Sequence, residues 1–411
     1  MGLEGEADKS LQVDFELWRQ RLADKGWGAP TWPVEYGGAG LSHPEAKVIS
    51  QEMGKMGAFN PIPLMAGMGV TMVGPTVLEY GTGDQKARHL PGIASGEIRW
   101  CLGLSEPNAG SDLASLATKA EDDGDYFTIN GQKVWTTSAH HADHGLLLAR
   151  TDWDAPKHDG LSYFIIDMHQ PEVSVHPLKQ MNGHASFNQV FFTDAVVAPE
   201  NQVDRIGNGW KVAMTTLMHE RRSADALRAV HRDHDLPGRI YDEERDETAT
   251  VMEPYKWYPQ RAGRVDLVFE RASEMGKMDD TVVRQAIAEL MIKARTAEWT
   301  ARRARAAQQQ GRPQGPEGSL GKLAASHVAR QASKVHTMIS GSDSMLEGED
   351  GPLAGLIAEI LVSVPATSIA GGTDEIQRNI IAERVLGMPK EPRMDTGPFR
   401  DVMKNPGPTH S

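Results

Sequence analysis

A glutamate within an apolar helical stripe is the residue of this sequence that most directly suggests chemistry. Ala213, Leu217, Glu220 and Ala224 recur at intervals of three and four residues, the spacing of one face of an α-helix. The pattern predicts that Glu220 packs inward, where burial raises the pKa of a carboxyl group toward neutrality. Such a carboxylate suits a general base. The alternative is a structural ion pair with a basic neighbour such as Arg221.

A glycine turn ahead of a helix is the second candidate. Gly371 and Gly372 directly precede Thr373, the predicted N-cap of a helix that ends at Gly387. Backbone N–H groups at the positive end of a helix dipole can hold an oxyanion, a phosphate or an electron-rich ring. An ordinary capped turn explains the same residues, so the pattern alone leaves both interpretations open.

Two further segments have the composition of ligand-facing backbone. The run Leu104–Asp112 (LSEPNAGSD) combines small residues with a proline turn, which lets the backbone approach a flat or phosphorylated ligand closely. The run Trp135–Ser138 places an aromatic ring beside hydroxyl groups that can bond a ring edge. A junction loop and a core tryptophan are the respective alternatives.

Composition excludes several classes of protein. The chain has 411 residues and a formal net charge of −13, which disfavours a nucleic-acid partner. It has no apolar run of membrane-spanning length, and its first residues, MGLEGEADKS, lack the apolar core of a secretory signal. The single cysteine, Cys101, excludes an internal disulfide and favours a cytoplasmic location. His140, His141 and His144 match no zinc-binding spacing, so we expect them at the surface or beside a ligand, with no metal.

The hydrophobic period changes twice along the chain. It predicts helices at 1–98, a β domain at 99–204 and helices at 205–390, with an insertion at about 231–264 and a tail at 391–411. Ser42 or His43 is expected to begin a helix, and Asn130-Gly131 is a strong hairpin signal. Later helices are expected from Asp279-Asp280 to Gly311, from Ser319 to Gly341 and from Thr373 to Gly387.

Taken together, three segments resemble motifs of the acyl-CoA dehydrogenase family. LSEPNAGSD is similar to T/S-E-P-x-A-G-S-D, KVWTTS at 133–138 resembles K-x-W-I-T-N, and GGTDEIQRNI at 371–380 matches E-G-T-x-x-I-Q-R except at its first residue. The resemblance covers roughly residues 12–390. It implies an α+β fold with an N-terminal helical domain, a central antiparallel β domain and a C-terminal four-helix bundle.

The resemblance also implies a chemistry. In such enzymes a carboxylate removes the α-proton of an acyl-CoA thioester while the β-hydrogen leaves as hydride to N5 of FAD, giving the 2-enoyl-CoA. The backbone N–H at the first position of E-G-T, with a flavin hydroxyl, polarises the thioester carbonyl. An electron-transfer flavoprotein is the implied electron acceptor.

One departure from the family pattern concerns the base. The usual glutamate of E-G-T is Gly371 here, which can donate its N–H but cannot accept a proton. Some family members, isovaleryl-CoA dehydrogenase among them, place the base instead on a helix with the motif L-x-x-E-R. The matching segment here is LMHER, which ends in Glu220 and Arg221. The resemblance therefore implies Glu220 as the base, and the missing side chain at 371 predicts room for a branched or bulky acyl group.

The resemblance assigns the remaining site residues. Those expected to contact FAD are Leu104, Ser105, Gly110, Ser111, Trp135, Thr136, Thr137 and Thr373. Those expected near the acyl-CoA are Ser111, Arg221 and Gly371.

Further departures affect the part of the FAD site that a neighbouring subunit provides in the family. The R-x-x-F-G segment reads ASEMG at 272–276, with Arg271 one position off, and Q-x-x-G-G reads MLEGE at 345–349. In these altered motifs the chain resembles a group of actinobacterial enzymes that form heterotetramers of paralogous subunits. Several of those enzymes act on steroid side chains. A homodimer or homotetramer stays open, as do a non-catalytic half-site partner subunit and a flavin monooxygenase or nitroalkane oxidase on the same fold.

Overall fold

The computed structural model describes residues 9–56, 58, 60–228, 257–311, 315, 317–392 and 395–402. These residues form two compact units, each described by itself. The first takes the described parts of Met1–Leu178, Ala185–Glu253 and Arg393–Ser411, and the second takes those of Lys179–His184 and Pro254–Pro392. Helix α6 (Gly209–Arg228), which begins just after the expected boundary near residue 204, packs into the core of the first unit.

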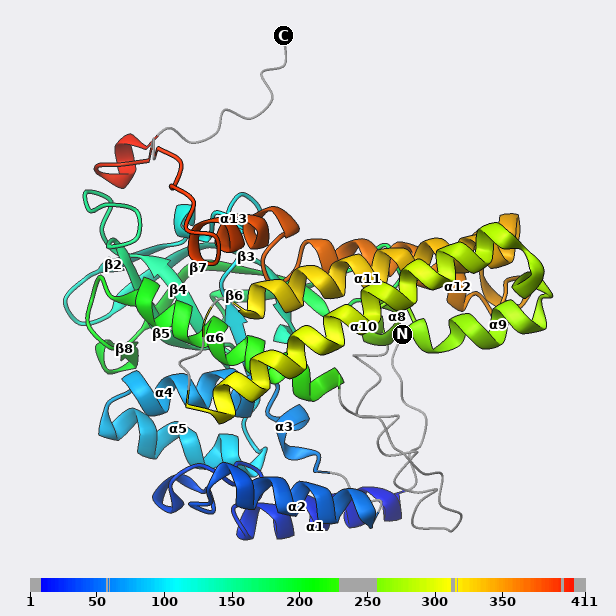
Figure 1. Ribbon diagram of the computed structural model, residues 1–411. Helices are drawn as coiled ribbons and strands as arrows, with labels where there is room; N and C mark the ends of the chain where they lie inside the picture. Colours follow the sequence, from blue (N-terminus) through cyan, green and yellow to red (C-terminus); the bar gives the residue numbers. More distant parts are fainter. Residues whose placement is uncertain are drawn as a thin grey trace. The chain divides into compact units, whose positions relative to one another are not determined.

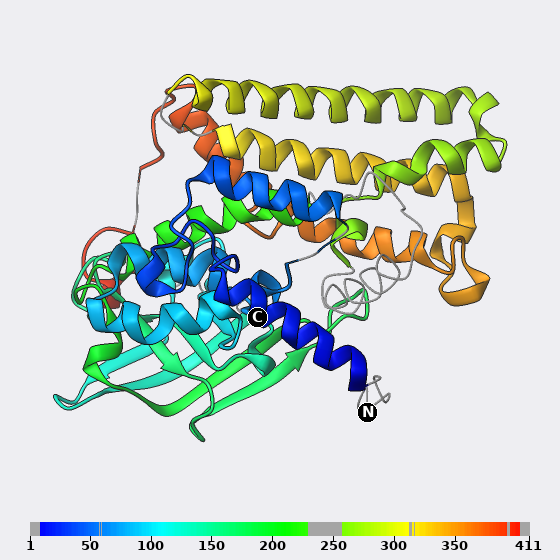
Figure 2. The same ribbon diagram turned by 90° about the horizontal axis from the view of Figure 1, so that it is seen from below.

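The helical character predicted for the N-terminal segment is confirmed. Its helices are α1 (Lys9–Asp24), α2 (His43–Lys55), α3 (Ile62–Met65), α4 (Gly74–Tyr80) and α5 (Gly83–Ser95). Ser42 caps α2 in a reciprocal arrangement with Glu45, as the sequence signal predicts. Figure 2 shows α4 and α5 over one face of the sheet of the same unit.

An eight-stranded sheet lies at the centre of the first unit. Its strands are β1 (Trp100–Gly103), β2 (Lys119–Asp122), β3 (Phe127–Thr137), β4 (His144–Arg150), β5 (Leu161–Asp167), β6 (Val173–Leu178), β7 (Phe187–Val197) and β8 (Gln202–Val203). The strand order is β6-β7-β3-β2-β4-β5-β8, and β1 pairs with β4 outside this path. The pairing is mainly antiparallel, as expected, although β1 runs parallel to β4.

The hairpin predicted at Asn130-Gly131 is wrong. Strand β3 runs through both residues, and the turn lies earlier, at Asp123–Tyr126, where Gly124 has a φ of 90°. Gly131 instead lies at an irregularity in the pairing of β3 with β7, and a Cβ there would be 2.6 Å from Thr118 Oγ1. The glycine therefore allows close packing beside Thr118 rather than a reversal of the chain.

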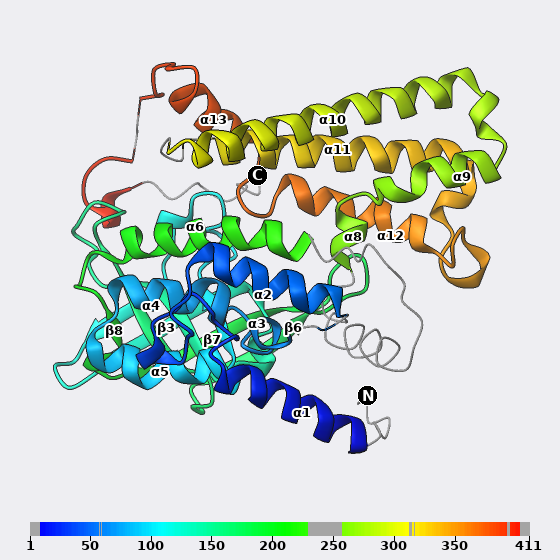
Figure 3. The same ribbon diagram turned by 60° about the horizontal axis from the view of Figure 1, so that its bottom comes forward.

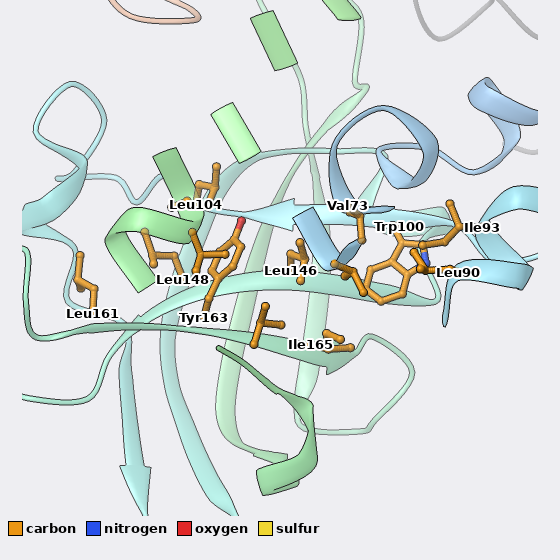
Figure 4. Close-up of a cluster of buried hydrophobic side chains, with 14 of the residues drawn as sticks. Val73, Leu90, Ile93, Trp100, Leu104, Leu146, Leu148, Leu161, Tyr163 and Ile165 are labelled. Carbon is orange, nitrogen blue, oxygen red and sulfur yellow. The ribbon is translucent and has the colours of Figure 1, made fainter. Parts of the chain in front are cut away.

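Both faces of the sheet are buried. Along β4, Leu146 enters one hydrophobic core and the next residue, Leu147, enters the other, because side chains alternate across a strand. Val212 of α6 packs in the first core. Figure 4 shows this core, with Trp100 near one end, Leu161 at the other and Leu104 between them. Strand β1 thus connects the core to the loop that begins at Leu104.

The second unit is helical. Its helices are α8 (Trp257–Arg261), α9 (Val268–Glu274), α10 (Thr281–Gln309), α11 (Glu317–Ser340), α12 (Leu356–Ser363) and α13 (Asp374–Arg384). The predicted long helices α10 and α11 lie side by side (Figure 1). Helix α12 is not apparent from the sequence pattern, because its short run, LIAEILVS, has little helical periodicity. Of the insertion predicted at 231–264, residues before Trp257 lie outside the described part of the chain. No helix within the described ranges has both the length and the apolar character needed to cross a membrane.

Candidate functional site

The loop Leu104–Asp112 is attached to strand β3 by a fully buried lysine. Lys133 Nζ donates to Leu104 O at 3.0 Å and to Glu106 Oε1 at 2.9 Å. Burial alone would raise the pKa of Glu106, but Lys133 and the backbone N–H of Ala117 hold that pKa below its ordinary value. The pair therefore stays charged and fixes the start of the loop to the strand.

Sequence reasoning did not assign a site role to Glu106 or Lys133. The available signal was that each is a charged residue within a segment already singled out for its ligand-facing composition. The backbone adds a hydrogen bond from Val134 N–H to Ser105 O at 2.9 Å. The structure thus brings the loop and the segment that begins at Trp135 together within the first unit.

A β-bulge presents Trp135 to solvent. The pairing of β3 with β7 shifts register between Lys133 and Thr136. Trp135 lies within this interval with a φ of 62°, a conformation that costs a non-glycine residue about 1–3 kcal/mol. Its side chain is 54% exposed and meets the ring of Phe187 edge-on at a centroid distance of 5.7 Å. A large exposed ring on a strained bulge is a surface suited to a flat partner.

The two hydroxyl groups after Trp135 differ in exposure. Thr136 is buried and lines a small internal void with Cys101 and Phe192. Its Oγ1 has no hydrogen-bond partner among the described residues. Thr136 can therefore reach a ligand on the outer surface only through its backbone, whereas the half-buried Thr137 keeps access to solvent.

The far end of the loop is open. Gly110 and Ser111 are exposed, and a Cβ at Gly110 would meet nothing within 4 Å. Lys157 Nζ holds the neighbouring Asp112 at 2.9 and 3.1 Å from its two carboxylate oxygens. The loop therefore has both ends fixed by ion pairs and presents small residues between them.

Glu220 lies on α6, and the helical turn before it is hydrogen-bonded to α4. Thr216 Oγ1 is 2.9 Å from Thr76 Oγ1 of α4, and Thr215 Oγ1 is 3.0 Å from Tyr80 Oη. Figure 3 shows α6 alongside α4. Glu220 follows Thr216 by one helical turn and is half-buried rather than fully buried as the periodicity predicts. The side chain of Arg221 lies outside the described residues.

The glycine turn belongs to the second unit. Gly371 and Gly372 have φ values of 68° and 89°, which glycine adopts without strain. Thr373 caps α13 by accepting the N–H of Ile376 at 3.2 Å, as predicted. The Gln377 side chain donates to Gly371 O at 3.3 Å and to Gly372 O at 3.4 Å. These two hydrogen bonds fix the carbonyl groups of the glycine turn to α13.

Arg271 is directed into the core of the second unit. It is 4% exposed, lies with its Nη1 3.0 Å from His336 Nδ1 and donates through Nη2 to Ser340 Oγ at 2.5 Å. These contacts occupy the guanidinium group with two neighbours on α11. Arg271 is therefore buried within the second unit, as is the next residue, Ala272, which is 0% exposed.

The three histidines do not act as a group. His140 and His141 are exposed and contact each other with tilted rings at a centroid distance of 4.0 Å, while the half-buried His144 packs against Trp100 at 5.1 Å. Burial lowers the pKa of His144. In the part of the chain that the structure describes, no group of three or more His, Cys, Asp or Glu residues is arranged to hold a metal ion.

Comparison with known proteins gives matches that cover most of the chain. Family models for the acyl-CoA dehydrogenase N-terminal, middle and C-terminal domains match residues 3–97, 101–195 and 265–386. Acyl-CoA dehydrogenase IpdE1 from Mycobacterium tuberculosis (strain ATCC 25618 / H37Rv) is 34% identical over 382 residues, covering 91% of this chain and 88% of that protein.

Two solved structures are similar over nearly the full length. The Tcur3481-Tcur3483 steroid ACAD matches with a TM-score of 0.69 and 29% identity, covering 92% of this chain and 89% of that chain. The ChsE4-ChsE5 complex from Mycobacterium tuberculosis matches with a TM-score of 0.67 and 26% identity, covering 93% and 92% of the two chains.

Proposed function

The chain belongs to the acyl-CoA dehydrogenase family and is an oxidoreductase, and from this premise we propose that it catalyses the FAD-dependent α,β-dehydrogenation of a branched or bulky acyl-CoA thioester. The product is the 2-enoyl-CoA. The observation that carries the proposal is the surface of the first unit where exposed Trp135 stands on a bulge next to the anchored loop Leu104–Asp112.

The residues of this surface fit FAD. The exposed ring of Trp135 offers a face to a flat isoalloxazine, and Thr137 offers a hydroxyl to the ring edge. The open space at Gly110 and the exposed Ser111 allow close approach of the backbone to a phosphate. When bound, FAD supplies the acceptor for the β-hydrogen as a hydride. The residues proposed to hold it are Leu104, Ser105, Gly110, Ser111, Trp135, Thr136, Thr137 and Thr373.

Glu220 is the proposed base that removes the α-proton. Its position one turn after Thr216, which is hydrogen-bonded to Thr76, limits its movement, and a half-buried carboxylate on a fixed helix suits a general base. Gly371 N–H is proposed to donate to the thioester carbonyl, and Ser111 and Arg221 to contact the CoA moiety. A Cβ at 371 would meet no atom within 4 Å. The lack of the family's glutamate side chain at this position supports the proposal of a branched or bulky acyl group.

A second subunit is proposed to complete the FAD site. Arg271 is held inside its own unit by His336 and Ser340, so this chain does not offer it to a neighbouring flavin. The similar solved structures include one named as a complex of two chains, ChsE4-ChsE5. We therefore favour a heterotetramer with a paralogous subunit over a homodimer or homotetramer, with a steroid side chain as one candidate acyl group and an electron-transfer flavoprotein as the acceptor.

The same arginine supports a second candidate function, a half-site subunit that binds no complete flavin alone. A visible absorption spectrum distinguishes the two candidates. An active subunit gives a flavin spectrum that acyl-CoA bleaches, alone or co-expressed with its partner. A non-catalytic half-site subunit leaves bleaching unchanged when its Glu220 is replaced in the assembled complex.

The decisive experiment is anaerobic titration of purified protein with linear, branched and steroid acyl-CoAs. We expect Glu220→Gln to retain flavin absorbance while its rate of bleaching falls by about 10²–10⁴-fold, because the α-proton then has no acceptor. Glu35→Gln, at an exposed position of the same unit, is the matched control and should bleach normally. Normal bleaching by Glu220→Gln would exclude it as the base.

A further inference from the structure

Residues 395–402, here called the C-terminal strap, return to the sheet of the first unit. Phe399 N–H donates to Ala155 O and Arg400 N–H donates to Trp153 O, both at 3.0 Å. The Phe399 side chain is only 3% exposed. The strap is therefore packed against the β4–β5 connection and is part of that unit's core.

Arg150 connects the strap with the segment that follows the loop Leu104–Asp112, because it contacts both. Arg150 is fully buried and donates to Ala114 O at 2.7 Å and to Leu116 O at 3.2 Å. The ring of Phe399 lies over its guanidinium group, with Cζ 3.4 Å from the ring centroid. A desolvated guanidinium is attracted to the face of such a ring more strongly than a hydrated one. Phe399 thus stabilises the cation that holds residues 114–116 in place.

A second connection reaches the loop itself. Lys157 Nζ is shared between Asp112, at 2.9 Å, and Asp395 of the strap, at 2.5 Å. The Lys157 side chain is 8% exposed, so it depends on both carboxylates for compensation of its charge. Asp395 therefore helps to fix the lysine that holds Asp112, the residue next to Ser111.

We propose that the C-terminal strap is a positioning element for the ligand-binding loop, with Asp395 and Phe399 setting the place of Ser111 and Asp112 through Lys157 and Arg150. The inference rests on the proposed function, since it takes the loop to bind FAD and CoA. Neither strap residue touches a reacting atom. Their expected effect is on binding of FAD and acyl-CoA rather than on the chemical step.

The test compares strap variants of the purified holoenzyme by FAD dissociation constant, KM for acyl-CoA and kcat. Asp395→Asn and Phe399→Ala should each raise the FAD Kd or the KM by roughly 5- to 10-fold, the equivalent of one lost charged contact, with kcat changed less than about 2-fold. Lys157→Arg keeps the charge and should restore most of the binding lost in Lys157→Met. Arg400→Ala, which removes only an exposed pair with Asp154, is the control and should behave as wild type.

The outcomes separate this inference from the proposed function. If the unmodified protein neither binds FAD nor oxidises any acyl-CoA, the proposed function fails. If it is active and folded Asp395→Asn and Phe399→Ala variants keep wild-type Kd and KM, the strap is only structural and the inference fails. Should Phe399→Ala not fold, the conservative Asp395→Asn variant decides the question, because it preserves volume and removes only the charge.

Discussion

Two segments of this protein are proposed to present their backbone to a ligand, the loop Leu104–Asp112 and the glycine turn at Gly371 and Gly372, and each contains or adjoins an acidic residue held by an ion pair. In the first unit Glu106 is held by Lys133, whose side chain is 0% exposed. In the second unit Asp374, directly after the glycine turn, is held by Lys322 and Arg330, whose side chains are 20% and 48% exposed. The first segment is therefore fixed by a cation that cannot be hydrated in the folded state, whereas the second relies on cations that water can replace.

The largest predicted effect is at the buried pair. Lys133→Met should lower the free energy of unfolding by about 3–5 kcal/mol, because it leaves the largely buried Glu106 carboxylate without its paired cation. Urea denaturation measures this, and adding Glu106→Gln should recover part of the loss. Lys55→Met, which breaks an exposed pair with Glu52, is the control and should cost less than about 1 kcal/mol. Equal losses in the two single variants would contradict the comparison.

The second prediction concerns Asp374, the carboxylate that follows the glycine turn of the second unit. Asp374 accepts from Ser326 Oγ at 2.9 Å besides its two cations, and it is 2% exposed. Asp374→Ala should cost about 1.5–3 kcal/mol, the usual value of a lost charged hydrogen bond, and less than Lys133→Met because the released Lys322 and Arg330 can be solvated. A greater loss than at Lys133 would reverse the ranking of the two segments.

A smaller loss of stability is expected from alanine substitutions in the glycine turn. Gly371→Ala places a side chain at a φ of 68° but in open space, so only strain of about 1–2 kcal/mol should appear in thermal unfolding. Gly372→Ala adds a contact, since its Cβ would lie 2.6 Å from Gln377 Nε2. The second variant should be the less stable of the pair, and the reverse order would show that the space at 371 is not open.

The smallest effect is a pH dependence. Burial opposes ionisation of Asp374, but Ser326 and Lys322 hold its pKa below the ordinary value. A carboxyl with a lowered pKa in the folded state stabilises the protein above about pH 4 and loses that contribution as pH falls through the lowered pKa. Wild type should therefore lose stability relative to Asp374→Asn as the pH falls below about 4 in thermal unfolding scans. Parallel curves for the two proteins would exclude the effect.

Local patterns predicted much of the fold. Ser42 and Thr373 act as helix caps, and the long helices α10 and α11 begin and end within a few residues of their expected positions. These features depend on side chains and backbone groups close in sequence, so short windows contain the information. The hairpin at Asn130-Gly131 failed because the competing requirement, close approach to Thr118, comes from a different segment.

The sequence by itself determined the order of helical and β segments, the family resemblance and the candidate base Glu220. Only the tertiary structure decided that Trp135 stands outward on a bulge, that Arg271 points into its own core and that residues 395–402 return to the sheet. The physical reason is that each of these outcomes depends on pairing between residues far apart in the chain. Strand register and buried charge compensation arise only when such partners meet, and no local pattern specifies them.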